Sequence, residues 1–149
     1  MERLLIQNIG LLATPAGHEA RRGPAQGEIS MTKNAWLLAE DGVIAASGTG
    51  APPDCGAAKV LDAQGCLVTP GLVDAHTHLI FGGWRQNELG LKLHGVSYLE
   101  ILARGGGILS TVEATRAASE AALVQKALPE LETMLRWGTT TCEIKSGYG

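Results

Sequence analysis

The residues best suited to chemistry in this sequence are His76 and His78, which close the short apolar run Pro70-Gly71-Leu72-Val73-Asp74-Ala75-His76-Thr77-His78. Residues i and i+2 of a β-strand point to the same face, so we expect the two imidazoles to project side by side. Neutral imidazole nitrogens in this arrangement can share one metal ion, whereas the alternative is a pair of strand histidines with ordinary hydrogen bonds. A catalytic zinc usually takes three protein ligands and a water. The run therefore predicts part of a metal site, with further ligands elsewhere.

Asp74 lies on the same face of this expected strand, one step deeper than the histidines. One interpretation is that its carboxylate orients an imidazole by a hydrogen bond to the ring and does not itself bind the metal. The other is an acid paired with a neighbouring group in the floor of the sheet. The sequence leaves both interpretations open.

Composition indicates a globular protein. The chain has 149 residues, a formal net charge of -3, 45% hydrophobic residues and 18% charged residues, enough for a packed core. We expect no nucleic-acid partner because no basic stripe is present, and no membrane insertion because no apolar run approaches about 20 residues. The first residues lack the apolar region of a signal peptide. Three cysteines without CxxC spacing suit a reducing compartment, so the expected location is the cytoplasm.

The first part of the chain, residues 1–69, reads as a small, sandwich-like antiparallel β domain. Asp41-Gly42 between two apolar runs is a strong hairpin signal. Glycines and prolines within residues 14–30 predict a loop or a variable insertion there. The expected strands cover residues 3–13, 34–40, 43–48, 59–62 and 66–69.

The second part, residues 70–149, alternates strand-like and helix-like segments and therefore predicts a parallel sheet. Ser97 is the expected N-cap of a helix that Gly105-Gly106-Gly107 ends, and Ser110 with Glu113 has capping-box spacing. Pro129 should kink or restart the last helix. A closed parallel barrel needs about 200 residues or more, so we expect a truncated fold. The expected elements are strands 72–78 and 139–145 and helices 96–104, 110–118 and 120–137.

The run that ends in His-x-His resembles the amidohydrolase superfamily, in which a small β-sandwich domain is joined to a metal-bearing (β/α)8 barrel whose first strand ends in this pair. Three later runs resemble one family within it, the imidazolonepropionases of histidine degradation. Leu79–Arg85 contains Phe81-Gly82-Gly83-Trp84-Arg85, although smaller or polar residues are expected just before the arginine. The other two runs are Gly105-Gly106-Gly107-Ile108-Leu109-Ser110-Thr111-Val112 with Ala114-Thr115-Arg116, and Glu143-Ile144-Lys145-Ser146-Gly147-Tyr148-Gly149.

The resemblance implies an α/β fold: part of a β-sandwich followed by the first strand–helix units of a TIM (β/α)8 barrel. It implies one zinc or iron ion held by His76 and His78, and substrate contacts by Arg85 and Tyr148. The implied reaction opens the cyclic amide of 4-imidazolone-5-propanoate to give N-formimidoyl-L-glutamate. The remaining metal ligands and the general acid and base are expected beyond residue 149. We therefore expect the isolated chain to be inactive and the full-length protein to be a homo-oligomer.

Each of these roles has a simpler alternative. Arg85 can be a surface arginine, and Tyr148 a partly buried aromatic with a satisfied hydroxyl. Glu143 and Lys145 share a strand face, where an ion pair is a better interpretation than an acid–base pair. The Gly105–Gly107 run lacks a phosphate-loop lysine, so it predicts a tight turn. The chain as a whole could also belong to another amidohydrolase, such as a deaminase or a dihydroorotase-like cyclic amidase, or be a non-catalytic fragment that self-associates through uncovered strand edges.

Overall fold

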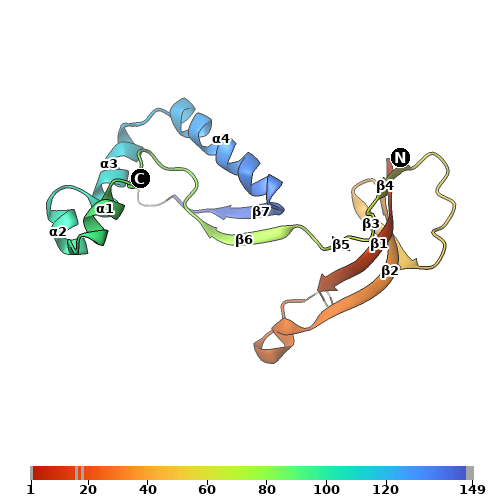
Figure 1. The fold of residues 1–149 in the computed structure, drawn as a ribbon. Coiled ribbons are helices and arrows are strands. Elements are labelled where there is room, and N and C mark those ends of the chain that lie inside the picture. The colour runs from red at the N-terminus through yellow and green to blue at the C-terminus, as the bar shows by residue number, and fades with distance from the viewer. Residues whose placement is uncertain (1, 16, 18, 147–149) are drawn as a thin grey trace. The chain divides into compact units, whose positions relative to one another are not determined.

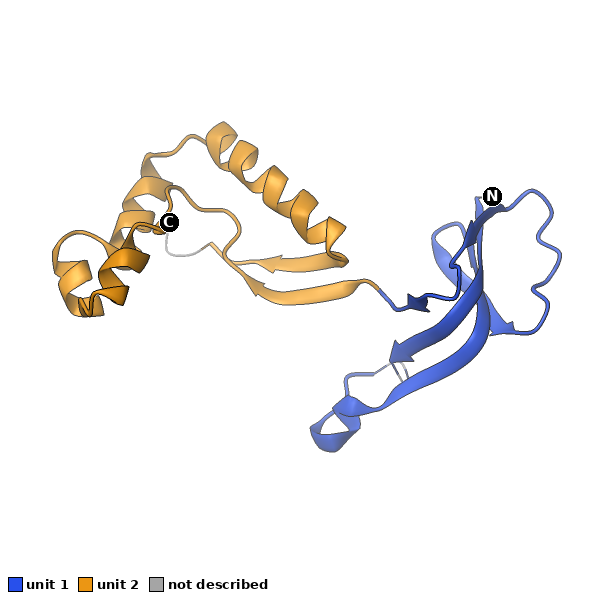
Figure 2. Cartoon of the chain, viewed as in Figure 1, with its two compact units in different colours: residues 1–70 blue, residues 71–149 orange. Residues whose placement is uncertain are grey.

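The chain divides into two compact units, residues 1–70 and 71–149 (Figure 2). The computed structural model describes residues 2–15, 17 and 19–146. The regular elements of the first unit are β-strands and a short 3-10 helix, whereas the second unit combines two strands with α-helices (Figure 1). The chain therefore has the mixed α/β character expected from its sequence.

The first unit is one twisted sheet in which the strand order is β3-β2-β1-β4, with β5 also paired to β1. The β2–β3 hairpin turns at Asp41 and Gly42, where φ is 48° and 81°. Positive φ at both central residues is what a two-residue type I′ turn requires, so the predicted hairpin is confirmed. The elements of this unit are β1 (Arg3–Pro15), the 3-10 helix η1 (Gly23–Gly27), β2 (Ile29–Glu40), β3 (Val43–Thr49), β4 (Lys59–Asp62) and β5 (Leu67–Val68).

The sheet is mixed, and the expectation of a purely antiparallel unit is wrong. β1 pairs antiparallel with β2 but parallel with both β4 and β5. Residues 50–58 carry the chain past β2 to the other side of β1, because a connection of this length allows a crossover where a short turn would force a hairpin. The crossover is therefore what makes β4 parallel to β1.

The predicted loop over residues 14–30 is shorter than expected. β1 and β2 remain paired as far as Pro15 and Ile29, and η1 occupies part of the connection. The added pairs do not extend the core, because Ile29 and Met31 on this part of β2 are 53% and 62% exposed. The core lies further along both strands, where one cluster of buried residues contains Ile9, Leu12, Ala35 and Leu37.

The second unit contains a strand–helices–strand arrangement in which β6 and β7 pair in parallel, as the sequence predicts. The connection between them holds all four helices (Figure 1). The backbone N–H of Leu72 donates to the carbonyl of Gly138 at one end of the pair, and that of Lys145 donates to Thr77 at the other. The elements are β6 (Leu72–Thr77), α1 (Glu88–Leu93), α2 (Tyr98–Ala103), α3 (Gly107–Ala117), α4 (Glu120–Arg136) and β7 (Thr139–Ile144).

Two helices begin where the sequence indicates. The Ser97 hydroxyl accepts a hydrogen bond from the N–H of Glu100 at the start of α2, and the Ser119 hydroxyl accepts one from Ala122 at the start of α4. Both contacts are side-chain N-caps, and the one at Ser97 was predicted. α4 then runs through Pro129 to Arg136 as one helix and does not restart.

Two other helix boundaries differ from the sequence expectation. α1 was not predicted, because its six residues are too few for a periodic apolar pattern. The capping box at Ser110 and Glu113 is wrong: α3 already begins at Gly107, and the Ser110 hydroxyl donates to the Gly107 carbonyl inside the helix. The start of α3 is instead capped by Glu88, from a different segment.

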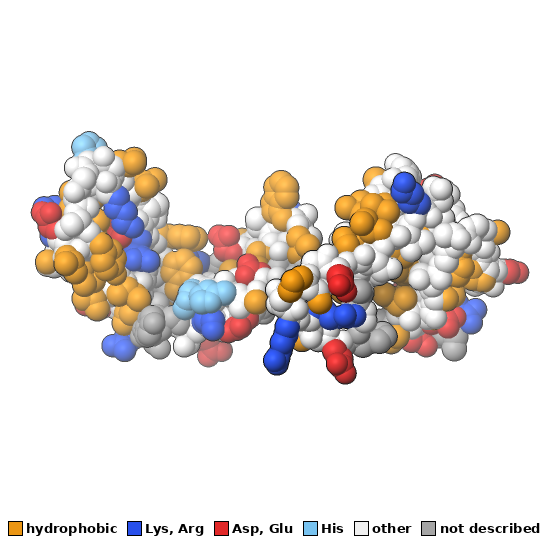
Figure 3. Space-filling view, turned by 90° about the horizontal axis from the view of Figure 1, so that it is seen from below, with side chains coloured by type: hydrophobic (Ala, Val, Ile, Leu, Met, Phe, Trp, Pro, Cys, Tyr) orange, Lys and Arg blue, Asp and Glu red, His pale blue; other side chains and the backbone are white. Residues whose placement is uncertain are grey.

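Many large hydrophobic side chains lie on the surface of both units (Figure 3). Among the described residues of the second unit, Ile101 and Ala127 are the buried hydrophobic side chains. No helix in the described part of the chain is long and apolar enough to cross a membrane. Exposed side chains of the second unit include Leu72, Val73, Leu128, Leu135, Trp137 and Ile144.

Candidate active site

The two histidines lie together at the end of β6. Their ring centroids are 5.2 Å apart and the ring planes are inclined by 69°, as expected for side chains two positions apart on one face. Thr77 lies between them in sequence, and its hydroxyl donates a 2.6 Å hydrogen bond to the Glu143 carbonyl of β7. The paired strands therefore hold the backbone that carries both imidazoles.

The donor chemistry and spacing of these rings suit a zinc or iron ion. Two imidazoles on one tetrahedral metal, at a metal–nitrogen distance of about 2.1 Å, have their ring centres roughly 5 Å apart. Within the described residues there is no group of three or more His, Cys, Asp or Glu side chains that could hold a metal. The pair therefore fits as part of a ligand set, not as a whole one.

Asp74 contacts backbone instead of an imidazole. Its Oδ1 accepts a hydrogen bond from the N–H of His76, at 3.1 Å. This bond fixes the backbone conformation of the residue that carries the first ring. Asp74 therefore supports the histidine pair through the main chain.

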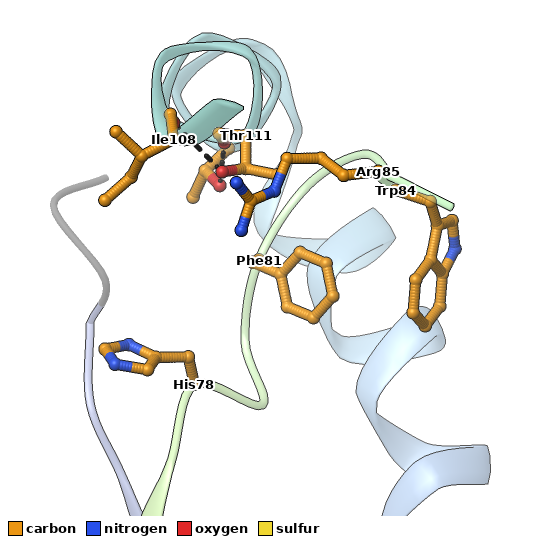
Figure 4. Close-up of a pocket in the computed structure, with 7 residues that line it drawn as sticks. His78, Phe81, Trp84, Arg85, Ile108 and Thr111 are labelled. Carbon is orange, nitrogen blue, oxygen red and sulfur yellow. Dashed lines mark hydrogen bonds between the residues drawn. The ribbon is translucent and has the colours of Figure 1, made fainter. Parts of the chain in front are cut away.

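A cavity of about 470 Å³ opens beside His78. Figure 4 shows the His78 imidazole and the Arg85 guanidinium bordering the same open space, with Phe81 and Trp84 on the loop below α3. The ring of Phe81 packs edge-on against Trp84, with centroids 5.2 Å apart. The cavity thus combines an apolar wall with a cationic group and a potential metal ligand. Its lining residues are His78, Phe81, Trp84, Arg85, Ile108, Thr111 and Thr115.

Helix α3 holds the loop that carries Phe81 and Arg85. The N–H of Gly82 donates a 2.9 Å hydrogen bond to the hydroxyl of Thr115, which itself donates to the carbonyl of Thr111. A Cβ at position 82 would lie 2.3 Å from the carbonyl oxygen of Ala114. Glycine is therefore required for this close approach of loop and helix.

Lys126 of α4 holds the same loop from another side. Its Nζ donates 2.8 Å hydrogen bonds to the carbonyl oxygens of Phe81 and Gly83. The same ammonium group lies 3.1 Å from the centroid of the Phe81 ring and 4.1 Å from that of Trp84, a cation–π arrangement. Burial lowers the pKa of Lys126, and the nearby charge of Glu130 opposes that shift.

Arg85 has an acidic neighbour. Its Nη1 lies 4.0 Å from Oε2 of Glu88, whose side chain is 7% exposed, whereas that of Arg85 is 39% exposed. The guanidinium thus has a buried acid 4.0 Å away on one side and borders the cavity on the other. A planar guanidinium in this position can bind a carboxylate through two parallel hydrogen bonds.

Other sequence candidates lie outside this arrangement. Tyr148 lies outside the described residues, so its role stays a prediction. Glu143 and Lys145 form an ion pair at 2.8 Å, with both side chains about half exposed. Gly105 follows the C-cap of α2 with φ of 81°, consistent with the predicted tight turn.

Sequence reasoning missed several residues of the cavity. Thr111 and Thr115 are four positions apart on α3 and therefore share a helix face, which was the available signal. No local pattern connects Lys126 to Phe81, 45 positions earlier in the chain. The missed lining residues are Phe81, Trp84, Ile108, Thr111 and Thr115, and the missed support of the loop is Lys126.

Comparison with known proteins agrees with the family resemblance seen in the sequence. A model of the amidohydrolase family matches residues 59–137. Over 146 residues the chain is 50% identical to an imidazolonepropionase of Bacillus velezensis, and over 151 residues it is 51% identical to one of Bacillus cereus. These alignments cover 97% and 100% of this chain but 35% and 36% of the relatives. The chain thus spans about a third of the length of the curated relatives it matches.

A solved structure shares the fold. The crystal structure of an amidohydrolase superposes with a TM-score of 0.57, covering 94% of this chain and 24% of that protein. Its sequence identity of 20% supports a common fold alone.

Proposed function

Because this chain belongs to the amidohydrolase family, we propose that the protein carrying it hydrolyses 4-imidazolone-5-propanoate to N-formimidoyl-L-glutamate. The observation that carries this proposal is that His78 and Arg85 border the same cavity. His78 could bind a metal ion and Arg85 could bind a carboxylate, so both groups could act on one substrate in this space. Relatives about 50% identical to this chain are imidazolonepropionases, which supports the choice of substrate.

We propose that the first unit is part of a β-sandwich and that the second is the beginning of a (β/α)8 barrel. The parallel pairing of β6 and β7 around intervening helices supports this assignment. So do the exposed side chains of Leu72 and Val73 on β6, because parallel strands are normally covered on both faces. The histidines at the carboxyl end of β6 then occupy the end of a barrel at which active sites lie.

In the proposed reaction, the oxygen of a water molecule forms a bond with the ring carbonyl carbon and the adjacent ring C–N bond breaks. The departing nitrogen takes a proton, and the former carbonyl carbon becomes a carboxylate. His76 and His78 would hold a zinc or iron ion, together with ligands outside the described residues. Such an ion, when bound, polarises a carbonyl and lowers the pKa of water toward about 7.

The residues of the cavity would bind and orient the substrate. Arg85 would pair with the propanoate carboxylate through its guanidinium. The rings of Phe81 and Trp84 would cover one side of the planar heterocycle and limit access of water to it. Tyr148 is proposed as a further substrate contact on the strength of the family resemblance alone. We assign no general acid or base to this chain.

The test is turnover of 4-imidazolone-5-propanoate by the purified full-length protein, with metal content measured on the same sample. We expect loss of the imidazolone and appearance of N-formimidoyl-L-glutamate. A protein that binds metal but leaves this compound unchanged would exclude the assignment. A parallel panel containing dihydroorotate and aminated heterocycles would then identify a different cyclic amidase or a deaminase.

The protein is further proposed to be a cytoplasmic homo-oligomer. Exposed apolar side chains of the first unit, such as Ile29 and Met31, support association. Sedimentation of the full-length protein tests this, since a single monomeric species across concentrations would refute it. For residues 1–149 alone we expect no turnover.

A further inference from the structure

Glu88 is the buried charged residue of the described chain, at 6% exposure. It begins α1, three positions after Arg85. An ionised carboxylate is rarely buried unless other groups compensate its charge. The surroundings of Glu88 therefore indicate what keeps it in the interior.

One carboxylate oxygen of Glu88 is used by α3. Its Oε1 accepts a 2.6 Å hydrogen bond from the N–H of Gly107, the first residue of that helix. The N-terminus of an α-helix carries a partial positive charge, which favours an acid at this position. Space for this oxygen exists because residue 106 is glycine: a Cβ there would lie 3.1 Å from Oε1.

The other oxygen faces the arginine of the cavity. Oε2 of Glu88 is buried and has no hydrogen-bond partner among the described residues. A cation lies close to it, because Nη1 of Arg85 is 4.0 Å away. Glu88 is thus bound rigidly on one side and presents its remaining charge to Arg85 on the other.

We propose that Glu88 is a positioning residue that orients the guanidinium of Arg85 for a substrate carboxylate. The carboxylate attracts one edge of the guanidinium, so the other donors of the planar group are directed into the cavity. Fixing the long arginine side chain in advance reduces the entropy lost when an anion binds. This inference rests on the proposed function, because it takes the ligand of Arg85 to be the propanoate group.

The test compares Glu88→Gln with the wild type in the full-length protein. Glutamine keeps the volume and an oxygen acceptor for Gly107 but removes the charge that faces Arg85. We expect KM for 4-imidazolone-5-propanoate to rise about tenfold with kcat changed less than about threefold, which is the signature of lost binding. The matched control is Glu100→Gln, which removes the acid of an exposed ion pair with Arg104, away from the cavity lining. This control should leave both constants unchanged.

Other outcomes overturn the inference or change how it is tested. An unchanged or lowered KM for Glu88→Gln, or an equal loss of kcat in both variants, would overturn the inference. If Glu88→Gln does not fold, Glu88→Asp replaces it, because the shorter side chain keeps the charge but withdraws it from Arg85; the same rise in KM is expected. If the wild type itself does not turn over the imidazolone, the proposed function fails. Crystal structures of wild type and variant then decide the role of Glu88: a guanidinium that keeps its position in the variant refutes it.

Discussion

Lys126 contacts Phe81 in two ways: its Nζ lies 3.1 Å from the centroid of the phenyl ring and donates a 2.8 Å hydrogen bond to the carbonyl oxygen of the same residue. A further bond to the Gly83 carbonyl ties the ammonium group to two points of one loop. This loop leads from the histidine pair to Arg85. Lys126 therefore connects α4 to the candidate active site.

Replacing Lys126 by methionine should loosen this loop. The partly buried carbonyl of Phe81 would lose its donor, which costs about 1–3 kcal/mol in the free energy of unfolding. Urea unfolding of the full-length protein measures the loss. The control is Lys92→Met, on an exposed lysine of α1, which should change stability by less than about 0.5 kcal/mol. Equal effects of the two substitutions would contradict the structural role of Lys126.

Lys126 should also produce a pH dependence of stability. Burial lowers its pKa in the folded protein relative to the value of 10.5 for an unfolded chain. Between the two pKa values the unfolded chain binds more protons than the folded one, so the free energy of unfolding increases with pH in that window. The Lys126→Met protein should lack this increase. Denaturant titrations at a series of alkaline pH values give the difference between the two proteins, and parallel curves would refute the lowered pKa.

Removing either imidazole of the pair should weaken metal binding. We expect His76→Ala and His78→Ala each to reduce zinc or iron affinity of the full-length protein at least about tenfold, since each removes a ligand. Metal content after dialysis against a weak chelator is the measurement. His94→Ala is the control, because His94 ends α1 and its Nδ1 contacts the carbonyl of Gly90. If both His76→Ala and His78→Ala retain the metal, the two histidines are not its ligands.

Arg85→Lys should weaken substrate binding with little effect on the chemical step. Lysine keeps the positive charge but cannot bind a carboxylate through two parallel hydrogen bonds. We expect KM to rise about tenfold or more and kcat to change only a few-fold. Arg136→Lys serves as the control, because Arg136 is an exposed residue of α4, 81% accessible, in a 4.0 Å contact with Glu132. A loss confined to kcat would argue for a different role of Arg85.

Gly82→Ala should destabilise the protein, whereas Gly90→Ala should not. The new Cβ at position 82 would meet the Ala114 carbonyl at 2.3 Å, so loop and helix must separate, at a cost of about 1–3 kcal/mol. A Cβ at position 90, inside α1, meets nothing within 4 Å, and alanine is favoured over glycine in a helix by roughly 1 kcal/mol. Thermal unfolding should therefore show opposite shifts of Tm. Shifts of the same sign would contradict the close approach at Gly82.

Local patterns predicted many of the elements. The apolar run before His76 predicts a strand, Asp41-Gly42 predicts a turn, and Ser97 predicts a helix start. These features depend on neighbouring residues, whose backbone preferences and side-chain hydrogen bonds act over a few positions. For the same reason the spacing of His76 and His78 could be predicted from strand geometry alone.

The sequence by itself therefore determined the β6 strand with its histidine pair, the parallel β6–β7 arrangement and the helix cap at Ser97. Tertiary structure decided the cavity, because its walls and supports come from segments far apart in the chain. The Gly82–Thr115 hydrogen bond joins residues 33 positions apart, and the Glu88–Gly107 bond joins residues 19 apart. The latter contact also explains why the capping box at Ser110 failed: a distant carboxylate caps α3 three residues earlier than the local pattern indicates. Local preferences set the elements, but only packing between α3, α4 and the loop after β6 brings Arg85 and His78 to one cavity.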